Sequence, residues 1–241
     1  MSRIEEFFKR VLDRTVIRAI RYVNDRAHPP VEPYEDVIAN VKRRAADASA
    51  DYIEAHLDGA LIFPFRGNVW DYALSKVGID GLHAEFGVHD GDSINHIADV
   101  LGRKNITIYG FDSFEGLKED WRGTWYRAGH FDRGGTLPAV RPNVTLVKGW
   151  FDESLPPFLS ANPGPFAFLH LDADTFETTA LLLSLLADRI VKGTVIIFDE
   201  YLGFPNWQRG EFLAWQNFVA ARGIKYRYLA FSNTPAAVEV L

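Results

Sequence analysis

The pattern of hydrophobic and polar residues changes character at Gly81. From there on, short runs of β-branched and aromatic residues alternate with segments of helical periodicity. Continuous apolar strands that alternate with helices are typical of a parallel, doubly wound sheet. Only Ser232–Pro235 separate the last two runs, which predicts an antiparallel C-terminal hairpin. The expected strands are 82–88, 106–111, 144–147, 166–171, 194–198, 226–231 and 236–240, and the expected helices are 93–101, 176–189 and 210–222.

The residues before this point are predicted to be helical. Residues 2–26 have apolar residues at helical spacing with Arg and Lys between them, and His28-Pro29-Pro30 would end that helix. Further helices are expected at 34–57 and 67–78. We interpret the basic residues as the solvated face of a helix that packs on its own chain or forms a homodimer contact, in preference to a membrane-surface helix. The predicted division is a helical extension or cap over 1–79 and a domain over 80–241.

Composition excludes several classes of function. The 241 residues contain no Cys, so a disulfide framework, a thiolate metal site and a cysteine nucleophile are impossible. The chain has 26 Lys and Arg against 32 Asp and Glu, which argues against a globally basic surface for nucleic acid. No apolar run approaches the roughly 20 residues of a membrane helix, and the N-terminus lacks the apolar region of a secretory signal. We therefore expect no membrane partner and a cytoplasmic location.

The first predicted strand runs into a turn that contains Gly87 and Gly91. Such a strand-to-helix turn lets a ligand approach the backbone closely, although this is not the dinucleotide pattern G-x-G-x-x-G. Glu85, at the end of the strand, is suited to a cationic group such as an amino-acid ammonium. Asp112 follows Gly91 by about 20 residues at the tip of the next strand, which suits a ribose diol. The two motifs indicate a nucleoside-containing cofactor and leave open whether it is NAD or S-adenosylmethionine.

Acidic residues follow the ends of two further strands. Asp172 and Asp174 come after one, and Asp199 and Glu200 after the other. Ligands bind at the carboxyl edge of such sheets, and carboxylates crowded there call for a cation such as Mg²⁺, Ca²⁺ or Mn²⁺. The alternative is that Asp174 only caps the next helix. His170 alternates inward on a buried strand, so we expect it to be structural.

Residues 115–142 form the one long stretch without clear periodicity. It contains Trp121, Trp125, Tyr126 and His130 among several glycines. Loops of this length in compact domains are usually functional lids or disordered segments. The aromatic content favours a lid.

Five blocks of the sequence resemble the macrocin-type sugar O-methyltransferases, which are class I S-adenosylmethionine-dependent enzymes. The Phe-Asp-Ser-Phe-Glu-Gly-Leu block is the most distinctive, and the resemblance covers about residues 80–215. It implies a Rossmann-like fold, S-adenosylmethionine, a divalent metal that is usually Mg²⁺, and a hydroxyl of a small polar natural product as acceptor. The blocks are 85–93, 109–117, 148–156, 172–179 and 199–201.

The resemblance also assigns residues to the site. The cofactor-binding positions it implies are Glu85, Gly87, Gly91 and Ser93 at the methionine end, Asp112 at the ribose, Ser113, Phe114, Gly149, Trp150 and Phe151 around the adenine, and Asp172. It places the metal on Asp172, Asp199 and Glu200, and the general base on Asp174. The family more often has Asp at the position of Glu200.

Three other functions remain open at this point. A catechol or phenol O-methyltransferase would chelate the same ion through a different acceptor. A metal-free binding module could have kept the fold, with Glu200 as the sign of a lost site. A nicotinamide-dependent oxidoreductase is disfavoured by the missing G-x-G-x-x-G motif.

Overall fold

A computed structural model of the chain describes residues 36–241. The chain divides into two compact units, residues 1–41 and 42–241. The predicted helix over 2–26 and the break at 28–30 lie outside the described residues, and the division of the chain at residues 79 and 80 stays a prediction. Within 36–241, no helix is long and apolar enough to cross a bilayer.

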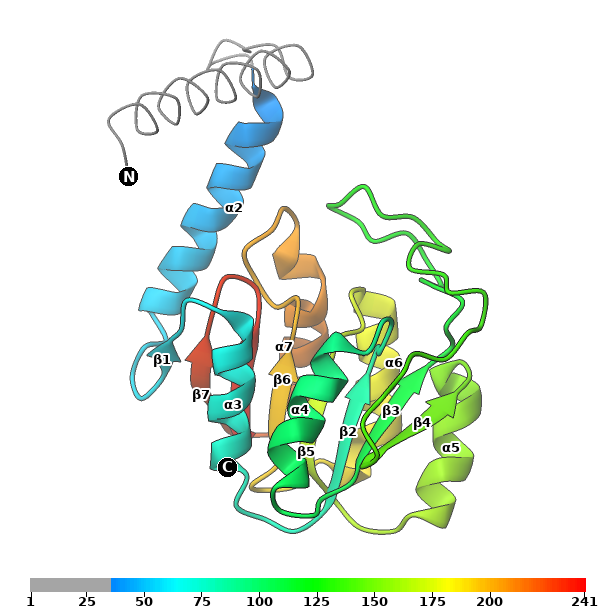
Figure 1. Ribbon diagram of the computed structural model, residues 1–241. Coiled ribbons are helices and arrows are strands. Elements are labelled where there is room, and N and C mark those ends of the chain that lie inside the picture. Colours follow the sequence, from blue (N-terminus) through cyan, green and yellow to red (C-terminus); the bar gives the residue numbers. More distant parts are fainter. Residues whose placement is uncertain (1–35) are drawn as a thin grey trace, which may run out of the picture. The chain divides into compact units, whose positions relative to one another are not determined.

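One sheet of eight strands organises the larger unit, in the order β1-β7-β8-β6-β5-β2-β3-β4 (Figure 1). Only β8 runs antiparallel to its neighbours, which confirms the mostly parallel sheet and the C-terminal hairpin. The strands are β1 (Leu61–Ile62), β2 (Leu82–Phe86), β3 (Ile108–Asp112), β4 (Val144–Lys148), β5 (Phe166–Leu171), β6 (Val195–Phe198), β7 (Tyr226–Phe231) and β8 (Ala236–Val240).

All seven predicted strands are present, and the expected strand number is corrected from seven to eight. The additional strand, β1, pairs in parallel with Ala230 and Phe231 of β7 at the sheet edge. Its two residues are too few to show any periodicity of hydrophobic residues.

The strand order reverses at β2. The chain proceeds from β2 to β3 and β4 in one direction, whereas β5 and β6 lie on the other side of β2. A sheet of this kind opens a crevice at the carboxyl ends of the strands beside the reversal. The fold therefore places the ends of β2, β3, β5 and β6 around one site.

Helices cover both faces of the sheet (Figure 1). Residues of α3 and α4 form one core with alternate strand residues such as Phe168 and Ile197. Residues of α2, α5, α6 and α7 form the other core with the opposite set, such as Leu169 and Phe198. The helices are α2 (Val37–Glu54), α3 (Arg66–Lys76), α4 (Asp92–Gly102), α5 (Phe151–Ala161), α6 (Phe176–Leu186) and α7 (Glu211–Arg222), with 3₁₀ turns at Ala187–Arg189 and Trp207–Arg209.

Helix α5 was not predicted from the sequence. Pro156 and Pro157 lie inside it, and proline removes a backbone donor and usually ends a helix. The structure accommodates them because Leu155 is fully buried and Phe158 packs against Tyr109 and Phe111. Tertiary packing thus overrides the local preference.

Four tyrosines form a hydrogen-bonded cluster between α2 and the sheet. The hydroxyl of Tyr228 lies 2.6 Å from that of Tyr52, 2.7 Å from that of Tyr201 and 3.4 Å from that of Tyr226. Gln216 donates to the hydroxyls of Tyr201 and Tyr226, both at 3.0 Å. The cluster therefore ties α2, α7 and β7 to the segment after β6, where Tyr201 directly follows Glu200.

We expect Tyr228→Phe to lower the free energy of unfolding by about 1–3 kcal/mol, since it removes the central member of a largely buried network. Chemical denaturation measures the change. Tyr109→Phe is the control, because the Tyr109 hydroxyl has no hydrogen-bond partner among residues 36–241. Equal stability of the two variants would contradict a stabilising role for the cluster.

Candidate functional site

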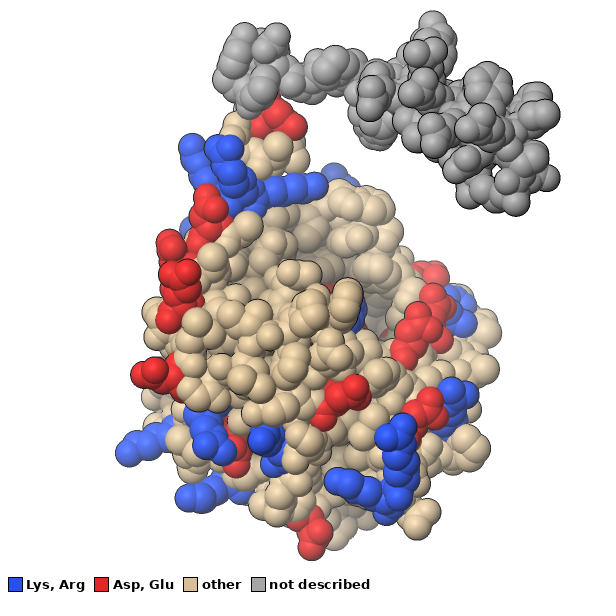
Figure 2. All heavy atoms as spheres, turned by 60° about the vertical axis from the view of Figure 1, so that its left-hand side comes forward, with Lys and Arg blue, Asp and Glu red and all other residues tan. Residues whose placement is uncertain are grey.

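A pocket of about 390 Å³ lies at the carboxyl edge of the sheet. It collects residues from the ends of β2, β3, β5 and β6, the turn after β4 and the 115–142 segment. On the face drawn in Figure 2, a hollow lies among uncharged residues and charged side chains gather mostly around the periphery. The predicted site residues that line the pocket are Gly87, Asp112, Ser113, Gly149, Trp150, Phe151, Asp172, Asp174, Asp199 and Glu200.

Four predicted cofactor residues lie outside this lining: Glu85, Gly91, Ser93 and Phe114. Glu85 is fully buried, and its carboxylate accepts hydrogen bonds from Ser93 at 2.9 Å and from His170. Phe114 is only 1% exposed and belongs to the hydrophobic core. Glu85 and Phe114 are therefore buried in the protein and do not face the pocket.

Gly87 is the glycine at which two chain segments approach most closely. It has φ of 91°, and a Cβ there would overlap the carbonyl oxygen of Asp172. The backbone N–H of Asp172 in turn donates to the carbonyl of Phe86 at 2.9 Å. Gly91 also has positive φ, but a Cβ there would only touch the side chains of Asn95 and Pro138 at 3.4 Å. The turn after β2 and the segment after β5 are therefore in direct backbone contact at Gly87.

Asp112 holds the same turn from the other side. One carboxylate oxygen accepts from the backbone N–H groups of Val88 and His89, both at 2.8 Å, and the other accepts from that of Phe114 at 2.7 Å. A carboxylate has about four acceptor positions, so one remains for a ligand hydroxyl at the pocket wall. Asp112 thus shapes the turn and still offers an acceptor to the pocket.

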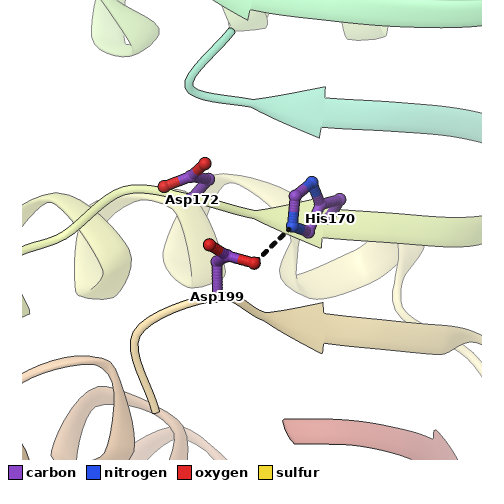
Figure 3. A group of neighbouring side chains, drawn as sticks. All are labelled: His170, Asp172 and Asp199. Atoms are coloured by element: carbon purple, nitrogen blue, oxygen red, sulfur yellow. Dashed lines mark hydrogen bonds and ion pairs between the residues drawn. The ribbon is translucent and has the colours of Figure 1, made fainter. Parts of the chain in front are cut away.

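A buried chain of charges runs beneath the pocket. His170 lies between Glu85, 2.8 Å from Nδ1, and Asp199, 3.4 Å from Nε2, and Arg66 donates to the second oxygen of Asp199 at 3.0 Å. Figure 3 shows His170 near the end of β5, Asp172 on the segment that follows this strand, and Asp199 just after the neighbouring strand β6. His170 is fully buried, as expected for a structural residue.

His170, Asp199 and Arg66 stabilise one another's charged forms. Burial lowers the pKa of His170, but its hydrogen bonds with Asp199 and Glu85 outweigh that effect and hold the pKa well above its ordinary value. Burial raises the pKa of Asp199, but His170 and Arg66 hold it below the usual range. Asp199 therefore carries its charge between two cationic partners.

The other acids at this edge lack such partners. Burial and then repulsion from Asp199 raise the pKa of Asp172 to about 7. Burial and the charge of Asp172 raise the pKa values of Asp174 and Glu200 well above the ordinary range. One oxygen of Glu200 is buried without a hydrogen-bond partner.

Two groups of side chains have ligand atoms that lie within 4.8 Å of one another. One comprises His170, Asp172 and Asp199, and the other Asp172, Asp174 and Glu200. Oxygen donors of this kind suit a hard divalent cation, and the unpartnered oxygen of Glu200 fits that use. The donor types present therefore fit a divalent cation, but the structure divides the predicted ligands Asp172, Asp199 and Glu200 between the two groups, which share Asp172.

The 115–142 segment forms an ordered arm beside the pocket. Its two halves pair through backbone hydrogen bonds, including those from Leu117 to His130 at 2.9 Å and from Trp121 to Tyr126 at 3.0 Å. Glu119 accepts from Thr175 and, at 2.8 Å, from Thr178 at the start of α6. The arm residues that line the pocket are Gly116, Leu117, Lys118, Trp121, Tyr126 and Phe131.

Sequence reasoning missed Arg66, Glu119 and Glu211 as site residues. Arg66 lies far along the chain from its partner Asp199, Glu119 lies far from its partners Thr175 and Thr178, and neither residue belongs to a motif. Glu211 stands at the start of a predicted helix, where an acidic residue is ordinary. No local signal distinguished these three residues from surface charges.

Comparison with known proteins identifies the domain that contains this pocket. Residues 84–201 match a family described as a methyltransferase domain. These residues are therefore similar to a methyltransferase domain. This match confirms the methyltransferase resemblance seen in the motifs.

A curated relative and two solved structures resemble this chain. The relative is the 8-demethyl-8-(2,3-dimethoxy-alpha-L-rhamnosyl)-tetracenomycin-C 4'-O-methyltransferase of Streptomyces olivaceus, 30% identical over 144 residues. That match covers 52% of this chain and 54% of the relative, so about half the length of each is compared. The calicheamicin methyltransferase CalS11 aligns with a TM-score of 0.60 and 22% identity over 89% of this chain and 95% of its own. The O-methyltransferase NovP aligns with a TM-score of 0.53 and 19% identity over 71% and 77%. The two structures show that the fold is shared.

The raised carboxyl pKa values predict how the stability of the metal-free protein changes with pH. A carboxyl group with a raised folded-state pKa binds its proton more tightly when folded, so its contribution is complete near pH 4 and is lost as pH rises toward the folded-state pKa. For Asp172 this window ends at about pH 7. In excess chelator, we expect the melting temperature to fall between about pH 4 and pH 7.

Asp172→Asn provides the comparison for this experiment. It removes the titrating group, so its melting temperature should fall less over the same interval. Calorimetric scans at several pH values measure both proteins. An identical pH dependence of variant and wild type would show that Asp172 does not titrate in this range.

Proposed function

We propose that this methyltransferase transfers a methyl group from S-adenosylmethionine to a hydroxyl of a small polar molecule, with a sugar favoured. The observation that carries the proposal is the pocket itself, in which the Gly87 turn and Asp112 meet Asp172, Asp174, Asp199 and Glu200. The methyltransferase domain and the rhamnose-modifying relative support it. A catechol or phenol acceptor is the alternative to a sugar.

The cofactor half of the site lies between the Gly87 turn and the turn after β4. We assign the ribose to the remaining acceptor position of Asp112, and the adenine to the space beside Ser113 and the 149–151 turn. Trp150 lines this space, with the ammonium of Lys118 5.3 Å from its ring centroid. Glu85 and Ser93 keep the turn in place through their bonds beneath it.

The acceptor half lies at the acidic loops. We assign the divalent cation to Asp172, Asp199 and Glu200; when bound, it would supply Lewis-acid activation of the acceptor hydroxyl. Arg66, whose side chain is 57% exposed, would have to share or release Asp199 for this ligation. Asp174 lies beside these residues, and its ionised form would accept the proton of the hydroxyl as methyl transfer proceeds. The arm excludes water from the side of Trp121 and Tyr126.

The first test is binding of the cofactor and the metal. Isothermal titration should show S-adenosylmethionine binding in the micromolar range, and methyl transfer should stop in excess chelator and return with Mg²⁺. Trp150→Ala should weaken cofactor binding about 5- to 150-fold through lost stacking. Trp125→Ala is the control, because Trp125 is 74% exposed and outside the pocket lining.

Two results would contradict the proposal. Tight binding of NAD without any binding of S-adenosylmethionine would refute the cofactor assignment. Full activity in excess chelator would refute the role of the metal and leave the acids with another purpose.

The second test concerns Asp174, which the geometry allows as a base or as a metal ligand. As a base, Asp174→Asn should lower kcat about 10²- to 10⁴-fold and leave Mg²⁺ and cofactor affinity nearly unchanged. A parallel loss of Mg²⁺ affinity would assign it to the ligand set instead. Nearly full activity would show that it only shapes the start of α6, since Asn and Asp are equivalent as caps.

A further inference from the structure

Glu211 connects the two loops that carry the acids. It is the first residue of α7, and its side chain is fully buried. One carboxylate oxygen accepts from the backbone N–H of Ala173 at 3.2 Å, and the other accepts from that of Glu200 at 3.1 Å. A single side chain thus bridges the segment after β5 and the segment after β6.

These two segments have few other connections. The last backbone bond in line with the β5–β6 ladder runs from Asp199 N–H to the carbonyl of Leu171 at 2.9 Å, and the strands end there. Ala173 lies between Asp172 and Asp174, while Glu200 follows Asp199. The two hydrogen bonds of Glu211 therefore hold these two segments at a fixed distance where the β5–β6 pairing has ended. They thereby fix the positions of the four carboxylates that the segments carry.

Acidic residues in the first turn of a helix do not ordinarily bridge two other segments through buried hydrogen bonds, as Glu211 does. Glu177 also lies in the first turn of its helix and is exposed to solvent, as acids at that position generally are. Glu211 instead turns inward among other carboxylates, where an additional negative charge is costly. Both of its oxygens are used on backbone N–H groups, which are strong, charge-assisted bonds when the acid is ionised.

We propose that Glu211 is a positioning residue that sets the affinity of the acidic loops for a divalent cation without touching the cation itself. The proposal rests on the metal site assigned above. It assigns Glu211 no contact with the cofactor, which lies toward β2 and β3. Residues that orient metal ligands typically change metal affinity about 10- to 100-fold when they are replaced.

The experiment compares Glu211→Gln with wild type and with Glu177→Gln as a matched control. Gln keeps the size of the side chain, but its amide NH₂ would face one of the two N–H donors, so one half of the bridge is lost. Electron paramagnetic resonance measures Mn²⁺ binding, and calorimetry measures binding of S-adenosylhomocysteine. We expect Mn²⁺ affinity to fall about 10- to 100-fold in Glu211→Gln only, with the affinity for S-adenosylhomocysteine within about twofold.

Catalysis provides a second readout. Saturating Mg²⁺ should restore most of the kcat of Glu211→Gln, which damage to the fold would not allow. If Glu211→Gln fails to fold, Glu211→Asp serves in its place, because it keeps the charge but is one methylene too short to span both loops.

The outcomes separate this inference from the proposed function. Wild-type Mn²⁺ binding with unchanged binding in the folded variant would overturn the inference and leave the proposed function intact. Loss of S-adenosylhomocysteine binding in parallel with Mn²⁺ binding would also overturn it, because the change would then be a general distortion. Failure of wild type to bind Mn²⁺ would refute the metal site and the inference together.

Discussion

Electrostatic repulsion at one edge of the sheet is the constraint on which the rest of the site depends. Glu85, Asp172, Asp174, Asp199, Glu200 and Glu211 gather there, and only His170 and Arg66 oppose them among the residues that contact them in the described part of the chain. Buried charges are tolerated only when they are paired, protonated or bound to a metal. The structure shows the first solution directly, because His170 and Arg66 pair with Asp199, and it favours the second, because burial and mutual repulsion raise the pKa values of Asp172, Asp174 and Glu200.

Much of the fold could be predicted because hydrophobic patterns report local structure. The seven longer strands each bury a run of apolar residues, and the hairpin of β7 and β8 follows from the short connection between them. By contrast, β1 is held only by its pairing with β7, and α5 contains two prolines that argue against a helix. Both depend on contacts with distant residues that no local window of sequence contains.

The positions of the acids in the candidate site could be predicted, but their hydrogen-bond partners could not. Acids at strand ends converge because parallel strands bring their carboxyl ends to one edge, so Asp172, Asp174, Asp199 and Glu200 could be placed together. The partner of each acid could not be predicted. Glu85 looked suited to a ligand, yet its oxygens bond with Ser93 and His170. Asp199 and Glu200 are neighbours in sequence, but the structure pairs the first with cations and leaves an oxygen of the second unpartnered.

The close fit of Gly87 against the carbonyl of Asp172 restricts which sequence changes this protein can accept. A side chain at Gly87, or an insertion in either segment, would move the turn after β2 and the segment after β5 together, so a change in one would disturb the other. Parts of the arm lack this restriction, since Gly129 and Gly134 have open space around them, whereas a Cβ at Gly116 or Gly123 would overlap a backbone carbonyl oxygen. We therefore expect sequence changes to be tolerated more easily at the open positions of the arm than in the two segments that meet at Gly87.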